Sequence, residues 1–146
     1  MKGRRKKPAR PREGDAAHRR ELVAFAAEAR KKAVAPFSRF KVGAALRTRT
    51  GEIVTGCNIE NATYGLTVCA ERTAIMKAVS EGLRDFEAIA VVARSKRPTA
   101  PCGPCRQLLW EFCGDIWVHI ADASGGKVTS HRMKDLLPLP FDARNL

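Results

Sequence analysis

The sequence predicts an α/β domain of three layers, α/β/α, in which helices cover both faces of a mixed five-stranded sheet. Three segments with apolar residues at helical spacing alternate with short β-rich runs, an order typical of this class. The chain has 146 residues, 45% of them hydrophobic. That is enough for one core and leaves no room for a second domain, so we expect a single domain over residues 15–146.

The first half of the chain should supply two helices and a hairpin. A helix is expected over 15–35, where Asp15 can act as N-cap and Pro36 ends the segment. Two β-rich runs, 40–48 and 52–57, then predict an antiparallel hairpin. A second helix opens at Cys69 and stops near Gly82.

The second half should complete the sheet. The continuous apolar run within 86–93 predicts a strand buried on both faces. A helix over 106–112 follows, and two further strands are expected at 116–121 and 127–132. Because only a short, glycine-containing turn joins them, we expect these fourth and fifth strands to be antiparallel.

Positive charge is concentrated at the amino terminus. The formal net charge is +12, and a large part of it precedes the first acidic residue, Glu13. Residues 1–14 are therefore expected to form a disordered basic extension, because they have too few apolar groups to offset their ordering entropy. Weak, salt-sensitive adhesion to RNA or membranes is an open role for it, but nucleic acid is not the expected partner of the domain. The basic residues are Lys2, Arg4, Arg5, Lys6, Lys7, Arg10 and Arg12.

Hydropathy and cysteine usage indicate the compartment. No run of some eighteen apolar residues is present, and no apolar signal core follows the basic start, so we expect neither a membrane span nor secretion. Five cysteines, unevenly spaced around an acidic residue, suit metal binding in a reducing, cytoplasmic setting. Cys57 and Cys113 lie outside any motif and are expected to be small buried hydrophobes.

Three cysteines occur with the spacing of a catalytic zinc site. Cys69 lies two residues before Glu71, and the segment Pro101-Cys102-Gly103-Pro104-Cys105 follows about thirty residues later. Three thiolates can hold one Zn²⁺ and leave its fourth position open to water. A first Cys or His ligand, a nearby Glu and a P-C-x-x-C pair are the pattern of zinc-dependent nucleobase deaminases.

Glu71 and two arginines are the candidate partners of this zinc. Glu71 is placed to move a proton from the water to a substrate nitrogen, as a general acid and base. Because three thiolates leave the site with a negative charge, Arg72 and Arg106 are expected to donate hydrogen bonds to the sulfurs. Either arginine could also be a solvated surface charge.

At this point the chain resembles the small, homotetrameric, zinc-dependent cytidine deaminases. The resemblance extends from the first helix to Phe141 and follows the order of that family's segments. The matching segments are FKVGAAL at 40–46, GCNIENA at 56–62, CAERTA at 69–74, PCGPCRQ at 101–107 and LLP at 136–138.

The resemblance implies which residues hold the substrate. Asn58 and Glu60 would bind the ribose 3′-hydroxyl, although polar residues at a strand end can also simply cap a turn. Glu71 and the backbone N–H of Ala70 would address the pyrimidine, and Phe40 would lie against it.

The resemblance also implies a homotetramer with shared active sites and one zinc ion per subunit. Phe141 would stack on the base from a neighbouring subunit, unless it is a core plug, and Tyr64 would reach across an interface. The chain departs from the family where Phe37 replaces the usual Tyr and where Asp142-Ala143 replaces Gly-Pro.

The predicted function is hydrolysis of cytidine and 2′-deoxycytidine to uridine and 2′-deoxyuridine, with release of ammonia. One alternative is a deaminase of a modified nucleoside, which should lack the Asn58-x-Glu60 pair. Another is a polynucleotide cytidine deaminase recruited by the basic tail, but Cys69 stands where those relatives usually have His. A non-catalytic zinc protein would not need Glu71 or an open coordination position.

Overall fold

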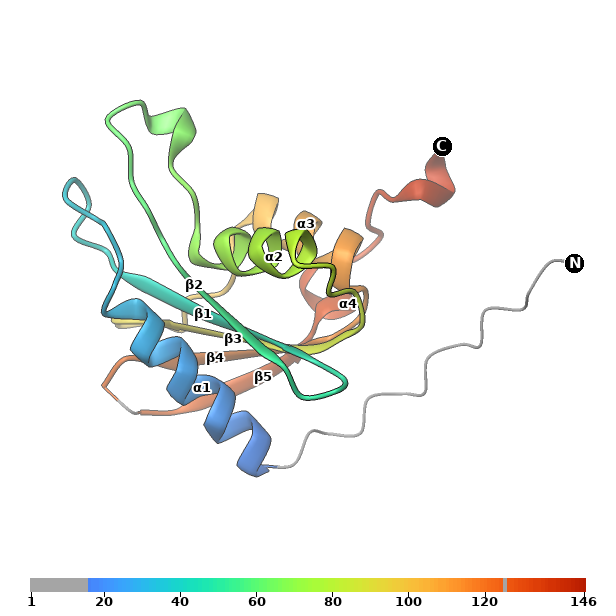
Figure 1. The fold of residues 1–146 in the computed structure, drawn as a ribbon, viewed down its shortest axis with the longest axis horizontal. Coiled ribbons are helices and arrows are strands. Elements are labelled where there is room, and N and C mark those ends of the chain that lie inside the picture. Colours follow the sequence, from blue (N-terminus) through green and yellow to red (C-terminus); the bar gives the residue numbers. More distant parts are fainter. Residues whose placement is uncertain (1–15, 125) are drawn as a thin grey trace, which may run out of the picture.

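The computed structural model describes residues 16–124 and 126–146 as a sheet with helices on both faces (Figure 1). The expected basic extension, 1–14, and the Asp15 cap lie outside these residues. The elements in chain order are α1 (Ala16–Arg30), β1 (Val42–Thr48), β2 (Ile53–Cys57), η1 (Tyr64–Leu66), α2 (Ala70–Ser80), β3 (Phe86–Ala93), α3 (Gly103–Cys113), β4 (Trp117–Asp122), β5 (Val128–Arg132), α4 (Met133–Leu136) and η2 (Ala143–Asn145).

The five strands form one mixed sheet in the order β2-β1-β3-β4-β5. β1 pairs antiparallel with both β2 and β3, β3 pairs parallel with β4, and β4 pairs antiparallel with β5. The predicted sheet, including the antiparallel fourth and fifth strands, is confirmed.

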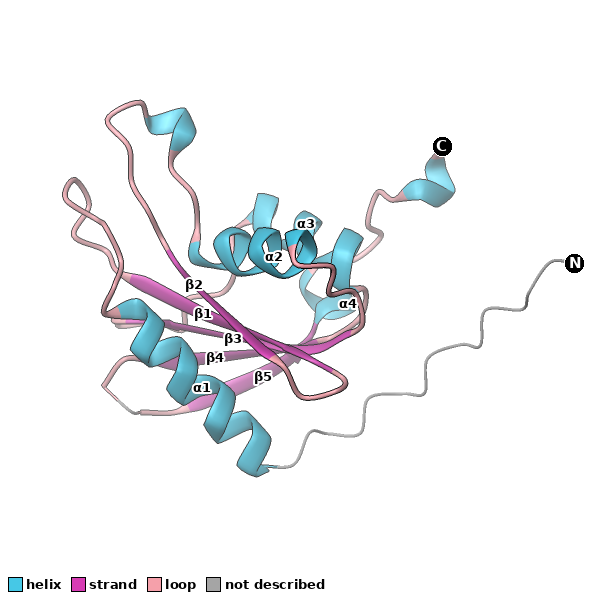
Figure 2. Cartoon of the chain, in the orientation of Figure 1, coloured by secondary structure: helices cyan, strands magenta, loops and turns pink. Residues whose placement is uncertain are grey.

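Alternate residues of the strands build two separate cores. Leu22 and Ala26 of α1 pack on one face against small side chains such as Ala45 and Ala90. On the other face, α2, α3 and α4 lie together (Figure 2), and Ile75 is among the buried residues of that core. The predicted three layers are therefore present, and the small residues under α1 allow it to lie close to the sheet.

The end of the first helix differs from the expectation. α1 ends at Arg30 rather than near Ala35, because the backbone beyond it pairs with a distant segment. The N–H of Val34 donates to the carbonyl of Asn58 at 3.0 Å, and the N–H of Glu60 donates to the carbonyl of Val34 at 2.8 Å. Pairing of residues far apart in the chain leaves no trace in local periodicity.

The third helix also begins earlier than expected, at Gly103 instead of Arg106. Pro104 lies in its first turn, where a missing N–H costs nothing because that N–H has no partner within the helix.

In the part of the chain that the structure describes, no helix is both long and apolar enough to cross a bilayer.

Gly43 sets the distance between α1 and the sheet. A Cβ at this position would lie 2.0 Å from the carbonyl oxygen of Ala26 and 2.4 Å from the backbone nitrogen of Arg30. We expect Gly43→Ala to lower the free energy of unfolding by about 3 kcal/mol, because backbone atoms cannot move aside as a side chain can. Urea denaturation followed by circular dichroism measures this.

The matched control is Gly65→Ala, since a Cβ at Gly65 meets nothing within 4 Å. It should change the free energy of unfolding by no more than about 0.5 kcal/mol. Equal stability of the two variants would show that α1 does not depend on close contact at Gly43.

Candidate active site

Two helix starts bring the three predicted cysteine ligands together. Cys69 is the N-cap of α2, Cys102 is the N-cap of α3, and Cys105 lies in the first turn of α3. Their sulfur atoms all lie within 4.8 Å of one another, and those of Cys69 and Cys102 are 3.9 Å apart. A tetrahedral zinc with Zn–S bonds of ~2.3 Å needs sulfurs about 3.8 Å apart, so these residues fit the ion.

The surroundings of Cys69 favour its thiolate form. Hydrogen bonding with the Cys105 thiol, then with Cys102, and the charge of Arg72 together lower the pKa of Cys69. The pKa of Cys105 is raised in turn, first by its hydrogen bond with Cys69 and then by burial. Both helix amino termini add partial positive charge. The cluster can thus supply a metal-ready sulfur near neutral pH.

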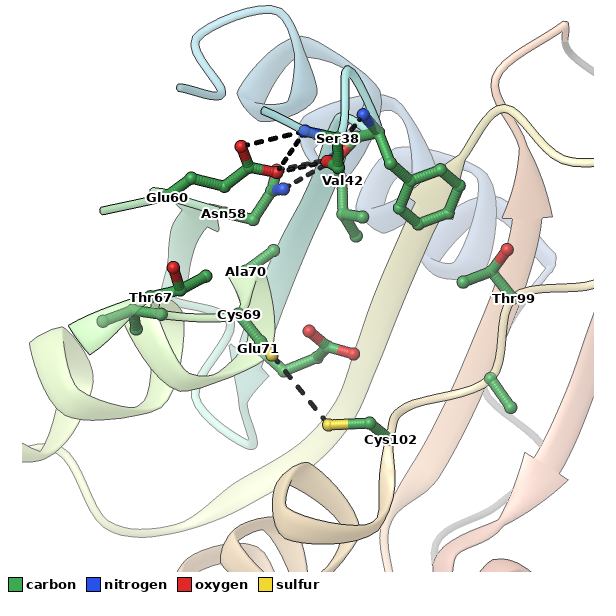
Figure 3. A pocket seen from close by; sticks show the side chains of 13 residues that line it. Ser38, Val42, Asn58, Glu60, Thr67, Cys69, Ala70, Glu71, Thr99 and Cys102 are labelled. Carbon is green, nitrogen blue, oxygen red and sulfur yellow. Dashed lines mark hydrogen bonds between the residues drawn. The ribbon is translucent and has the colours of Figure 1, made fainter. Parts of the chain in front are cut away.

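Glu71 lies beside these sulfurs in the first turn of α2. Its side chain is 5% exposed, and its carboxylate lies beside the line that joins the sulfurs of Cys69 and Cys102 (Figure 3). Burial raises the pKa of Glu71 to about 7, with a smaller contribution from the charge of Cys69. A carboxyl group with such a pKa can both accept and return a proton near neutrality.

A cavity of about 270 Å³ opens onto Glu71, Cys69 and Cys102. Its walls include most of the predicted substrate residues, and one aromatic side chain faces the loop of Thr99 across the space (Figure 3). The predicted residues in the walls are Phe40, Asn58, Glu60, Cys69, Ala70, Glu71 and Cys102. The structure therefore brings together the loop before β1, the segment directly after β2, the start of α2 and the loop before α3.

Asn58 holds the start of β1. Its Oδ1 accepts a hydrogen bond from the N–H of Val42 at 2.8 Å, and its Nδ2 donates to the carbonyl of Phe40 at 2.8 Å. The residue is buried. An Asn amide has a second N–H and further lone pairs, so this bracing role leaves capacity for a ligand.

Glu60 holds the loop that precedes Phe40. Its carboxylate accepts hydrogen bonds from the N–H of Phe37 at 2.8 Å, from the N–H of Ser38 and from the Ser38 hydroxyl. The Ser38 hydroxyl is the main cause that lowers the pKa of Glu60. The carboxylate is therefore ionised and can only accept further hydrogen bonds.

Phe141 and Tyr64 are not brought into this cavity. Phe141 is 60% exposed, and its carbonyl oxygen accepts a hydrogen bond from Nε2 of Gln107 at 2.8 Å. Tyr64 is 77% exposed and makes an edge contact with Phe37, with ring centroids 6.0 Å apart. Within one chain, neither residue is among those that line the cavity beside Glu71.

The two arginines differ in their contacts. The charge of Arg72 is one of the smaller causes that lower the pKa of Cys69. Arg106 donates from Nε to the carbonyl of Pro101 at 2.7 Å and from a terminal nitrogen to the carbonyl of Leu136 at 2.8 Å. These bonds tie the loop before Cys102 to α4, which is a structural use that the sequence did not indicate.

Several wall residues were missed by sequence reasoning. They are small or apolar, and all but Val42 lie outside the segments that match the family: Ser38, Val42, Thr67, Val68, Thr99 and Ala100. Some of these residues could have been identified from their closeness in sequence to predicted site residues. Ser38 and Val42 lie two residues on either side of Phe40, and Thr99 and Ala100 directly precede the second cysteine motif.

Asp142, where the sequence departs from the family pattern, has a local structural role. It is the N-cap of η2 and accepts a hydrogen bond from Nε1 of Trp110 at 3.0 Å. An ion pair with Arg144 also holds it. The departure thus creates a braced carboxyl-terminal turn directly after Phe141.

Comparison with known proteins agrees with this geometry. The sequence profile of the cytidine and deoxycytidylate deaminase zinc-binding region matches residues 17–120. The cytidine deaminase of Halalkalibacterium halodurans is 50% identical over 129 residues, which are 88% of this chain and 97% of the relative. That of Sporosarcina psychrophila is 46% identical over 86% of this chain and 93% of the relative. The crystal structure of the Burkholderia pseudomallei cytidine deaminase has a TM-score of 0.81 at 47% identity, covering 84% of this chain and 98% of the other.

Removal of one buried sulfur should abolish zinc binding. We expect Cys105→Ala to lose stoichiometric zinc, because two thiolates alone cannot hold the ion in a tetrahedral site. Metal analysis of the purified protein after dialysis against a mild chelator measures this.

Cys57→Ala is the matched control, since Cys57 is also a free thiol but is not in the sulfur cluster. It should keep one zinc per chain. Retention of zinc by Cys105→Ala would contradict the three-sulfur site.

Proposed function

This chain belongs to the cytidine and deoxycytidylate deaminase family, and we propose how its residues carry out the reaction in the cavity described above. The function is zinc-dependent hydrolysis of cytidine and 2′-deoxycytidine to uridine and 2′-deoxyuridine, with release of ammonia. The observation that carries it is a buried carboxyl group, Glu71, beside three converging sulfurs, at a cavity whose walls also include Asn58 and Glu60.

Glu71 is the proposed proton carrier. Zinc, held by Cys69, Cys102 and Cys105, supplies when bound a water nucleophile at neutral pH. Glu71 takes a proton from that water and passes it to the pyrimidine N3. A carbon–oxygen bond forms at C4, the carbon–nitrogen bond breaks, and a second proton moved by Glu71 lets the amino group leave as ammonia. Charge from Arg72 offsets the negative sulfurs.

The remaining wall residues are proposed to position the nucleoside. Ala70 follows the N-cap of α2, where backbone N–H groups have no partner within the helix, so its N–H can donate to the base. Phe40 supports the flat face of the base. Asn58 and Glu60 bind the ribose 3′-hydroxyl with the capacity left over from their loop contacts.

Two observations support a nucleoside rather than a polynucleotide as substrate. The Asn58 and Glu60 side chains line the cavity together, which suits a ribose. β4 ends at Asp122 and β5 begins at Val128, so the connection between the last two strands is too short for a helical crossover.

The five cysteines have free thiols, and three thiolate ligands need reducing conditions, which supports a cytoplasmic location.

Replacement of the proton carrier tests the function. We expect Glu71→Gln to lower kcat for cytidine by ~10²–10⁴ while zinc content stays at one per chain, because the amide cannot accept the water's proton. Conversion of cytidine to uridine and release of ammonia are measured in parallel.

Glu81→Gln serves as the control, because Glu81 lies directly after α2 and is exposed. Its kcat should match that of the wild type. Near-normal turnover by Glu71→Gln, or no turnover of cytidine by the wild type, would refute the assignment.

We also propose that the enzyme is a homotetramer in which neighbouring subunits complete each cavity. Large apolar side chains are exposed near the cavity and at the carboxyl terminus, and such exposure is typical of subunit interfaces. Leu139 is 98% exposed and has a left-handed backbone with φ 49°, two residues before Phe141. The exposed residues include Phe37, Tyr64, Leu66, Leu139 and Phe141.

Shared sites predict complementation between two impaired variants. We expect Phe141→Ala to lower kcat/KM by about tenfold through loss of stacking on the base. Co-expression with Glu71→Gln, followed by purification through two different tags, should give hybrids with restored activity, because some sites then combine an intact Glu71 with a neighbour's intact Phe141. Each variant purified alone is the control, and hybrids no more active than Phe141→Ala alone would exclude a shared site.

A further inference from the structure

A single hydroxyl joins the aromatic wall of the cavity to its carboxylate wall. The N–H of Phe40 donates to Oγ of Ser38 at 3.0 Å, and Oγ of Ser38 donates to Oε1 of Glu60. We propose that Ser38 is a positioning residue that aims Glu60 at a hydroxyl donor of the substrate and fixes its place relative to Phe40. This inference depends on the proposed function, which supplies the ribose 3′-hydroxyl as that donor.

The direction of the hydrogen bonds fixes the chemistry. A serine hydroxyl has one hydrogen, and because the N–H of Phe40 already donates to Oγ, that hydrogen is directed to Glu60. Glu60 also receives the N–H groups of Phe37 and Ser38. These donors all come from residues 37–38, on one side of the carboxylate. A ligand can therefore bind its remaining lone pairs only by donating, so a nucleoside with a ribose 3′-hydroxyl is favoured over an analogue without one.

The backbone between Ser38 and Phe40 explains why a hydroxyl is needed there. Arg39 has φ 57°, a left-handed conformation that is uncommon outside glycine. The Ser38 hydroxyl bridges this residue by binding the N–H of Phe40, and Asn58 binds the carbonyl of Phe40 from the other side. Phe40 is thus held at both backbone groups, by Ser38 from its own loop and by Asn58 from the segment after β2.

Ser38→Ala tests the proposal with two substrates, cytidine and 3′-deoxycytidine. The measured quantity is the ratio of kcat/KM for cytidine to kcat/KM for 3′-deoxycytidine. We expect this ratio to fall about tenfold in Ser38→Ala. Without the Ser38 hydroxyl the Glu60 carboxylate is no longer held in place, so its hydrogen bond with the 3′-hydroxyl is weaker. Ser38→Thr keeps the hydroxyl and should keep the ratio. A purely structural effect would lower kcat/KM equally for both substrates and leave the ratio unchanged.

Ser80→Ala is the matched control, since the Ser80 hydroxyl donates to the carbonyl of Lys77 at the far end of α2, away from the cavity. It should not change the ratio. If the ratio is unchanged in Ser38→Ala, whether or not kcat/KM falls equally for both substrates, the proposed role of Ser38 is overturned. Failure of the wild type to deaminate cytidine would instead refute the proposed function, so the two failures are distinguishable.

Discussion

The active site depends on the way α2 lies on β2. A Cβ at Gly56 would come within 2.5 Å of both the carbonyl oxygen of Ala70 and the backbone nitrogen of Ala74, so helix and strand meet through backbone atoms. This contact fixes the first turn of α2, which carries Cys69 and Glu71. Because the other two sulfurs come from the start of α3, the metal site requires two helices to begin at the same point above one sheet face.

A second constraint arranges the substrate side of the cavity. Ile59 forms bridges with Val34 and with Val68, so residues 58–60 are extended although they lie outside the named strands. In an extended segment alternate side chains share a face. Asn58 and Glu60 therefore both line the cavity, while Ile59 points away and is exposed. One residue must therefore separate Asn58 from Glu60 if both side chains are to face the cavity.

The sequence predicted those features that depend on local pattern. The apolar run over 86–93 predicted both ends of β3 correctly. The cysteine spacing predicted the sulfur cluster. The end of α1 was missed because it depends on pairing between Val34 and residues 58–60. The loop contacts of Glu60 were missed for the same reason, since Ser38 lies 22 residues earlier. The role of Phe141 cannot be read from one chain, because its ring lies outside that chain's cavity.

Two glutamates in one small cavity have opposite environments, and this separates their proposed roles. Glu71 is buried, and the loss of water raises its pKa to about 7. Glu60 is surrounded by donors from Phe37 and Ser38, which lower its pKa. Burial penalises the charged form of a carboxyl group and donated hydrogen bonds stabilise it. The same type of side chain can therefore carry protons at position 71 and remain an ionised hydrogen-bond acceptor at position 60.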